Sequence, residues 1–285
     1  MATTTTNPTP LFTIPIPAIA KNAAGTIVCT SPAPLIYLLT ITCPPDNRLT
    51  PASCAAFLTA LDILELSPQL YPPGVVVTTS GIPKFYSNGL DLDLAFSIPS
   101  FLPHSLFALF RRFLTYPMPT VALLNGHAFA GGLMLAMHHD YRVMNPSKGF
   151  VCVNELEFGV PLKPAMSSIF RTKLPAATYR QLVLEAHRFG GAQAVEAGIA
   201  DLVGGLEETV RFVEGRKLTG KAKSGIYGVL KAEMYRESVG LLGPGDHERE
   251  EERHRRLAVE DEERRRVGEE RVEAWRREGG KKAKL

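Results

Sequence analysis

The chain has 285 residues, 45% of them hydrophobic, and a formal net charge of +3 at pH 7. A chain of this size can bury a large core, either as one domain or as one domain with an appendage. The small net charge argues against a nucleic-acid partner. The cysteine spacings fit neither a zinc site nor a small disulfide scaffold. We therefore expect reduced, mostly buried thiols at Cys29, Cys43, Cys54 and Cys152.

The first part of the chain predicts a loose arm, three strands and a helix. Residues 1–10 are rich in Thr and Pro and lack the basic and apolar segments of a signal peptide, so we expect a loose arm. Short strands are predicted near Leu11–Ile16, Thr26–Thr30 and Ile36–Thr42. A turn then leads to a predicted helix over Pro51–Leu66, with Thr50 as its N-cap.

The next part twice repeats the order strand, glycine-containing loop, helix. In the first unit, Val75–Thr79 is a β-branched run typical of a buried strand. A turn at Ser87–Gly89 follows, and a helical pattern starts at Leu90 with Asp91 in its first turn. The second unit has a buried strand at Val121–Leu124. Further helices are predicted at Ser105–Thr115, from about Leu133, at Ala165–Lys173 and at Thr178–Phe189. The alternation indicates an α/β fold.

The second unit lies in a segment, residues 121–142, that is almost apolar enough to be a membrane span. Asn125, His127 and the glycines inside it argue against a span. Gly131 and Gly132 open the predicted helix, and a helix N-terminus offers free backbone N–H groups that can hold an oxyanion. Such glycines can also serve tight packing alone. Two loops of this kind, side by side, could each donate one N–H to the same carbonyl oxygen.

Four segments resemble, in order and spacing, the signature segments of the crotonase (enoyl-CoA hydratase/isomerase) superfamily. The first two resemble its oxyanion segments, the third its acidic segment, and the fourth a helix that ends at a glycine before the exit strand. They are Tyr86–Leu92, Asn125–Gly132 with Ala136 and Asp140, Asn154–Gly159, and Gly191–Val203. The first and third segments look most like those of the peroxisomal Δ3,Δ2-enoyl-CoA isomerase branch.

The resemblance implies a fold, an assembly and a binding site. The fold would be an α/β spiral of stacked ββα units over residues 11–205, followed by a C-terminal helical region over residues 206–245. The assembly would be a homotrimer or hexamer. The backbone N–H groups of Asn88 and Gly131 would hold the thioester oxygen of an acyl-CoA. Other expected substrate contacts are Ser87, Gly89, Leu90 and Met134, and Lys84 could meet a CoA phosphate or be a solvated loop lysine.

The acidic residues narrow the reaction that the resemblance implies. Hydratases of the family use two carboxylates, and the first position is Met134 here, while the second is Glu155. Dienoyl-CoA isomerases carry a further acid at the place of Lys163. One base suffices for a 1,3-proton shift, so Glu155 is the predicted catalytic residue. Glu157 is the rival, because in an extended stretch it would share the face of Glu155.

Three functions remain open from the sequence. The first is a Δ3,Δ2-enoyl-CoA isomerase of fatty-acid β-oxidation. The second is another crotonase-type acyl-CoA enzyme, a hydratase or a member of a specialised pathway. The third is a non-catalytic binding protein with the same fold. We expect no cofactor beyond the coenzyme A of the substrate. We also expect no metal, because His127, His138 and His139 lack metal-ligand spacing.

The C-terminal 40 residues differ in composition from the rest. Residues 246–278 are dominated by Glu and Arg, which predicts a solvent-exposed helix supported by ion pairs, weakened at Gly268 and ended by Gly279–Gly280. The chain ends in Ala283-Lys284-Leu285, which resembles the Ser-Lys-Leu peroxisomal address. We therefore expect a peroxisomal location and recognition of this tripeptide by the peroxisomal import receptor.

Overall fold

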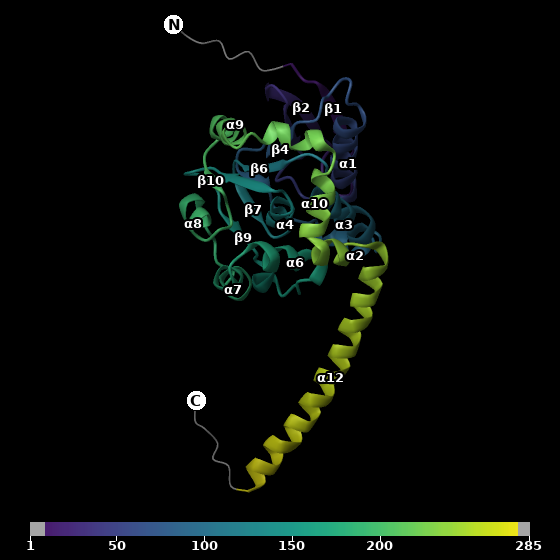
Figure 1. The fold of residues 1–285 in the computed structure, drawn as a ribbon. Coiled ribbons are helices and arrows are strands. Elements are labelled where there is room, and N and C mark those ends of the chain that lie inside the picture. Colours follow the sequence, from purple (N-terminus) through teal and green to yellow (C-terminus); the bar gives the residue numbers. More distant parts are fainter. Residues whose placement is uncertain (1–8, 279–285) are drawn as a thin grey trace. The chain divides into compact units, whose positions relative to one another are not determined.

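The computed structural model describes residues 9–278. The chain divides into two compact units, residues 1–243 and residues 244–285 (Figure 1). Within residues 9–278, no helix is both long and apolar enough to cross a membrane. The C-terminal tripeptide Ala283–Leu285, the predicted helix stop at Gly279–Gly280 and most of the predicted N-terminal arm lie outside the described residues.

A seven-stranded sheet forms the centre of the first unit (Figure 1). The two pairs at the β1 edge are antiparallel, and the remaining neighbours are parallel. In order across the sheet, the strands are β1 (Phe12–Ile16), β2 (Gly25–Ala33), β3 (Ile36–Thr42), β4 (Val75–Ser80), β6 (Thr120–Leu124), β8 (Tyr141–Met144) and β10 (Leu202–Val203). Every residue of β4 and β6 is buried, as expected for parallel strands covered on both faces.

A second, three-stranded parallel sheet determines where the loops of the site lie. It consists of β5 (Phe85–Ser87), β7 (His127–Phe129) and β9 (Val151–Cys152), with β7 in the middle. Each of these strands follows a different strand of the main sheet along the chain, so the pairing brings together loops that are distant in sequence. Between β6 and β7, a side chain at Gly126 would lie 2.5 Å from the carbonyl oxygen of Lys84, so only glycine permits this close approach.

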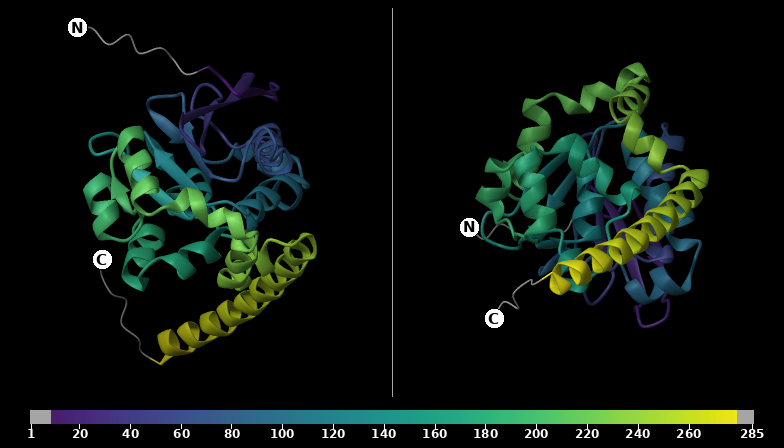
Figure 2. Two further views of the ribbon diagram at one scale, coloured as in Figure 1. Left: turned by 45° about the horizontal axis from the view of Figure 1, so that its top comes forward. Right: turned by 90° about the horizontal axis from the view of Figure 1, so that it is seen from below.

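The helices of the first unit cover both faces of the main sheet (Figure 2). They are α1 (Pro51–Leu66), α2 (Leu92–Ser97), the π-helical turn η1 (Phe101–Leu106), α3 (Phe107–Thr115), α4 (Gly131–Met137), α5 (Glu155–Phe158), α6 (Pro164–Lys173), α7 (Ala176–Leu184), α8 (Gly191–Glu196), α9 (Leu206–Gly215), the 3₁₀ turn η2 (Leu218–Ser224), α10 (Tyr227–Met234) and α11 (Arg236–Leu241). The predicted α1 is confirmed over its whole length, and Thr50 caps it through a reciprocal capping box with Ser53.

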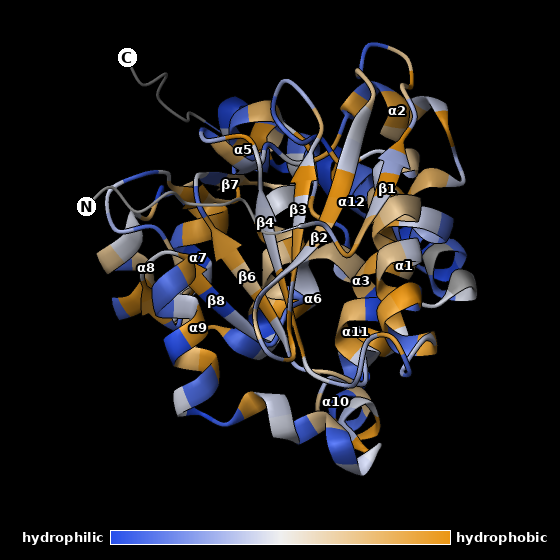
Figure 3. Cartoon of the chain, turned by 90° about the horizontal axis from the view of Figure 1, so that it is seen from above, coloured by the Kyte–Doolittle hydropathy of each residue, from blue (hydrophilic) through white to orange (hydrophobic). Residues whose placement is uncertain are grey.

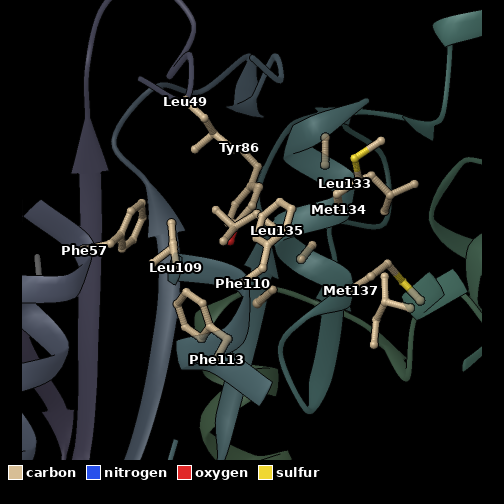
Figure 4. Close-up of a cluster of buried hydrophobic side chains, with 14 of the residues drawn as sticks. Leu49, Phe57, Tyr86, Leu109, Phe110, Phe113, Leu133, Met134, Leu135 and Met137 are labelled. Carbon is tan, nitrogen blue, oxygen red and sulfur yellow. The ribbon is translucent and has the colours of Figure 1, made fainter. Parts of the chain in front are cut away.

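The larger hydrophobic cluster packs α1, α3 and α4 against one face of the main sheet (Figure 4). All seven residues of α4 are buried, which explains why its sequence is apolar all round. Phe57 of α1 and Phe110 and Phe113 of α3 supply large aromatic rings to the same cluster. A smaller cluster on the other face joins β3, β4, β6 and β8 to α9 and η2, and Figure 3 shows β6 as mostly hydrophobic.

Several predicted boundaries are wrong, and the reasons are local. Helix α2 begins at Leu92 rather than Leu90, because the Asp91 carboxylate accepts the Leu94 N–H (3.1 Å) and acts as the N-cap outside the first turn. Helix α4 begins at Gly131 itself. Residues 155–158, expected to be extended, form the short helix α5, which ends at Gly159 in a left-handed conformation. Helix α7 ends at Leu184, five residues early.

The second unit contains one long helix, α12 (Pro244–Arg277), of 34 residues. Figure 2 shows it as a continuous helix. Gly268 lies inside it without interrupting the helix, although a glycine in a helix interior costs about 1 kcal/mol relative to alanine. The prediction of a charged, exposed helix is confirmed for these residues.

Candidate active site

A cavity of about 710 Å³ opens in the first unit where the two glycine-containing loops meet. Its wall combines apolar side chains with a small number of polar and charged groups, as is common for sites that bind small molecules. The wall includes Asp46, Arg48, Asn88, Leu90, Asp91, Asp93, Gly131, Asn154 and Glu155. Apolar surface comes from Phe96, Leu102, Phe158, Val160, Leu162 and Met166.

Glycines let the two loops approach each other closely. Gly89, in the first loop, has φ +82°, and a side chain there would lie 3.0 Å from the carbonyl oxygen of Phe129. A side chain at Gly132, in the first turn of α4, would lie 2.4 Å from the carbonyl oxygen of Ser87. At Gly131 a Cβ atom would lie 3.4 Å from the backbone nitrogen of Leu90. The backbones of the two loops are therefore adjacent at the cavity wall.

Two backbone N–H groups at this contact, those of Leu90 and Gly131, find no acceptor among the described residues. Gly131 is the first residue of α4, so its N–H has no partner inside the helix. Leu90 forms a parallel bridge with Leu49, in which Gly89 accepts from Leu49 and Asp91 donates to it. The N–H of Leu90 therefore points away from Leu49. Both residues line the cavity.

The prediction that Asn88 supplies the first oxyanion N–H is wrong. The Asn88 N–H donates to the carbonyl oxygen of Asp46 (3.0 Å), and its side-chain Nδ2 donates to the Asp46 carboxylate (2.6 Å). The donor with no internal acceptor lies two residues later, at Leu90. In an extended segment, successive residues direct their N–H groups to opposite sides, so the Leu90 N–H points away from the side on which the Asp91 N–H donates to Leu49. The sequence resemblance located the loop but not which of its N–H groups is free.

Glu155 lies in the wall of the same cavity, at the first position of α5. Its Oε2 atom is fully buried and has no hydrogen-bond partner among the described residues. Burial raises the pKa of the Glu155 carboxyl to about 7, because an ionised carboxylate loses solvation there. A carboxylate of this pKa can both accept and return a proton near neutral pH.

The other acids in the wall already have partners. Asp46 accepts from Arg48 Nε (3.2 Å) and from Asn88. Asp91 accepts from Asn22 Nδ2 (2.8 Å) while it caps α2, and Asp93 forms an exposed ion pair with Lys21. Among the acids that line the cavity, Glu155 is therefore the one whose carboxylate accepts no hydrogen bond from another described residue.

The rival acid Glu157 is exposed and forms an ion pair with Arg188 (3.1 Å). It does not line the cavity. Glu157 was a rival only if residues 155–158 were extended. They form helix α5 instead, and residues two apart on a helix face different directions.

Four other residues predicted to contact substrate do not line the cavity. Ser87 is buried. Its hydroxyl donates to the carbonyl oxygen of Asn47 (2.8 Å) and accepts from the Gly89 N–H (3.2 Å), and these two hydrogen bonds stabilise the loop. Met134 is fully buried in the hydrophobic cluster (Figure 4). The Lys84 ammonium lies 5.3 Å from the centre of the Phe85 ring. Of the predicted contacts of this kind, Leu90 alone is at the wall.

Asn154 is a wall residue that the sequence did not indicate. Only 8% of its surface is exposed, and its Oδ1 atom is buried without a partner among the described residues. It occupies the N-cap position of α5 but makes no capping hydrogen bond. An N-cap asparagine would ordinarily bond to its own helix, and no sequence signal distinguishes this one.

The opposite end of α4 has side-chain partners for its carbonyl groups. His138 Nδ1 donates to Met134 O (2.7 Å), and His139 Nδ1 donates to Leu135 O (2.9 Å). Lys173 Nζ donates to Met137 O (2.7 Å) and to His139 O (2.6 Å). Burial lowers the pKa of His138 to about 3, so the ring is neutral and serves packing. Within residues 9–278, no group of three or more potential His, Cys, Asp or Glu ligands is placed to hold a metal ion.

Comparisons with known proteins agree with this architecture. Residues 34–236 match the model of a family described as enoyl-CoA hydratase/isomerase, and the chain belongs to that family. It is 33% identical over 225 residues to "Enoyl-CoA delta isomerase 2, peroxisomal" of Arabidopsis thaliana, which covers 73% of this chain and 92% of the relative. It is 32% identical over 227 residues to "Enoyl-CoA delta isomerase 3" of the same plant, covering 73% and 91%.

Solved structures share the crotonase fold. An enoyl-CoA isomerase from Mycobacterium tuberculosis matches with a TM-score of 0.66 at 25% identity, covering 76% of this chain and 93% of that one. Human mitochondrial delta3-delta2-enoyl-CoA isomerase matches with a TM-score of 0.61 at 23% identity, covering 73% and 82%. The predicted family and fold class are thereby confirmed.

Proposed function

We propose that this chain is a Δ3,Δ2-enoyl-CoA isomerase, which moves a double bond of an unsaturated fatty acyl-CoA from C3 to C2. The observation that carries the proposal is the meeting of three groups in one cavity wall. Two are the backbone N–H groups of Leu90 and Gly131, and the third is the buried carboxylate of Glu155. The names of the Arabidopsis relatives point to the same reaction.

The reaction follows from the chemistry of these groups. Glu155 takes a proton from C2, and the electron pair of that C–H bond moves toward the thioester carbonyl, giving an enolate oxygen. The N–H groups of Leu90 and Gly131 donate to this oxygen, and one such donor is typically worth about 10²–10³ in rate. The electrons then return through C2 and form the double bond between C2 and C3, while the C3–C4 π bond breaks and its electron pair takes the proton from Glu155 at C4. No proton is gained or lost overall.

Hydration of a 2-enoyl-CoA requires more than this site offers. In the family pattern, a second carboxylate helps to hold and activate a water, and its position is Met134 here. That side chain is fully buried among apolar residues. The proposed reaction needs no cofactor, because the thioester of the substrate itself stabilises the carbanion.

The reaction assignment is tested by supplying the purified protein with a 3-enoyl-CoA and, separately, with a 2-enoyl-CoA. We expect fast formation of the conjugated 2-enoyl product from the first and little 3-hydroxyacyl product from the second. Comparable rates for the two substrates would show that another group activates water. Absence of turnover with both would support the binding-protein alternative.

We further propose that the protein acts in peroxisomes, delivered by an import receptor that reads Ala283-Lys284-Leu285. The support is the sequence of this tripeptide and the word "peroxisomal" in the names of two relatives. A fluorescent protein fused ahead of the chain should enter peroxisomes, and removal of the tripeptide should leave it in the cytosol. A punctate peroxisomal signal from the truncated form, in cells lacking the full chain, would contradict this proposal.

A further inference from the structure

Helix α12 lacks the feature that stabilises most protein helices, a buried apolar face. Four of its five large apolar side chains are close to half exposed or more: 49% for Leu257, 66% for Val259, 45% for Val272 and 55% for Trp275, while the fifth, Val267, is partly exposed. Something other than apolar burial must therefore stabilise 34 consecutive helical residues.

The apolar residues of α12 also do not form the seam of a coiled coil. A coiled coil needs apolar residues that alternate three and four apart over several heptads. In steps of four and three residues, the positions between Leu257 and Trp275 are Asp261, Arg264, Gly268 and Arg271, and none of them has a large apolar side chain. A second copy of the helix would find no continuous apolar stripe against which to pack.

Ion pairs along the helix surface provide the alternative. The described side chains of α12 form eight, all between residues three or four apart: Asp246–Arg249, Glu250–Arg253, Glu252–Arg255, Asp261–Arg264, Asp261–Arg265, Glu263–Arg266, Arg266–Glu270 and Glu273–Arg277. In seven of them the acid precedes the arginine, which is the more favourable orientation on a helix. The pairs extend over nearly the whole length of α12.

We propose that α12 is a self-supporting single helix, stabilised in water by its own ion pairs and needing no partner. At 1.5 Å per residue it is a stiff spacer about 50 Å long for the residues that follow it. This role is independent of the proposed isomerase activity, which uses residues of the first unit only.

The test measures the end-to-end distance of α12 in the full chain. Nitroxide labels are attached at Glu248→Cys and Ala274→Cys, two exposed positions, while the four native cysteines are buried. A continuous helix predicts a narrow distance distribution near about 39 Å by pulsed electron resonance. A flexible chain of the same length would give a broad distribution centred near about 28 Å. Isomerase turnover, measured on the same sample, should be unchanged.

Charge variants separate ion-pair support from other causes. Replacing Arg264, Arg265 and Arg266 by Glu turns four pairs into repulsions and should broaden and shorten the distance distribution. The matched triple substitution to Lys keeps the charges and should preserve the narrow distribution. The proposal is overturned if the Glu variant keeps the narrow distribution, or if hundredfold dilution of the protein with unaltered charges abolishes it, since the latter would show that another copy holds the helix.

Discussion

The two ends of helix α4 are built from the same apolar segment but are treated in opposite ways. At the C-terminal end, histidine and lysine side chains donate to four carbonyl groups. At the N-terminal end, Gly131 lines a cavity and its N–H has no acceptor among the described residues. A folded protein rarely leaves polar groups unpaired where it could pair them. Under the proposed function, the C-terminal end serves stability and the N-terminal end serves the substrate.

A large effect is expected from closing the approach of the two loops at the N-terminal end. In Gly132→Ala, the new Cβ atom would lie 2.4 Å from the carbonyl oxygen of Ser87, so the loops must separate and the two N–H donors diverge. Loss of one oxyanion donor typically costs about 10²–10³ in kcat, and we expect a loss in this range.

Gly240→Ala is the control for this variant, because the helical Gly240 has no atom within 4 Å of its added Cβ. It should keep full activity and gain slightly in stability. Wild-type kcat in Gly132→Ala would mean that the contact between the loops does not hold the donors in place.

The pH dependence of kcat/KM provides the second test of the site at the N-terminal end of α4. Glu155 must be ionised to accept the C2 proton, and its pKa is raised to about 7 by burial. We expect kcat/KM to fall about tenfold per pH unit below pH 7 and to level off above it, as measured with a 3-enoyl-CoA between pH 5 and 9. A profile that is flat down to pH 5 would show either that Glu155 has an ordinary pKa or that it is not the base.

A substitution at the C-terminal end of α4 should lower the free energy of unfolding and leave the catalytic rate almost unchanged. Lys173→Met removes the donor to Met137 O and leaves His139 O with Arg142 alone. A buried carbonyl left without a donor costs about 1–3 kcal/mol, so the free energy of unfolding should fall by this amount, as measured in urea. Activity per folded molecule should stay within a small factor of wild type.

The exposed Lys223→Met is the matched control for this lysine, and it should leave unfolding unchanged. If Lys173→Met instead unfolded at the wild-type urea concentration but lost kcat, the C-terminal end of α4 would contribute to catalysis rather than to stability, and the proposed roles of the two ends would be wrong.

The remaining prediction concerns a gain in stability. The native state binds a proton at Glu155 more tightly than the unfolded chain does, because its folded pKa is raised from 4.5 to about 7. This carboxyl therefore favours the native state least above pH 7, where it must be buried in ionised form. Glu155→Gln should be more stable than wild type at pH 8, and this advantage should shrink toward pH 5. An advantage that does not change with pH would contradict the assignment of the raised pKa to this group.

Sequence reasoning located the elements that are determined locally. Helix α1 has a capping residue, a proline in its first turn and a sharp C-terminal boundary, and its bounds were predicted correctly. The two strand–loop–helix units followed from their local patterns, and the choice of Glu155 followed from the resemblance to the crotonase segments. Their placement in one cavity depends on the pairing of β5 with β7, which no short-range pattern encodes.

What the sequence could not predict depended on single hydrogen bonds. Whether the free N–H belongs to Asn88 or Leu90 is decided by the carbonyl of Asp46 and the bridge to Leu49, both more than 35 residues away. Residues 155–158 form a short helix, and four residues are too few for hydrophobic periodicity to distinguish a helix from an extended segment. The unpaired side chain of Asn154 became evident only once its surroundings were known.

The most direct test of the account compares Glu155→Gln with Glu157→Gln. The amide keeps the size of the side chain but cannot accept a proton, and general acid–base catalysis is typically worth about 10²–10⁴. With no second acid to compensate, Glu155→Gln should lose isomerase kcat at or above the upper end of that range while acyl-CoA binding stays nearly intact. Glu157→Gln, which removes an exposed ion pair, should cost little. If Glu155→Gln keeps more than about a tenth of the wild-type rate while Glu157→Gln is inactive, the assignment of the base is wrong by two residues.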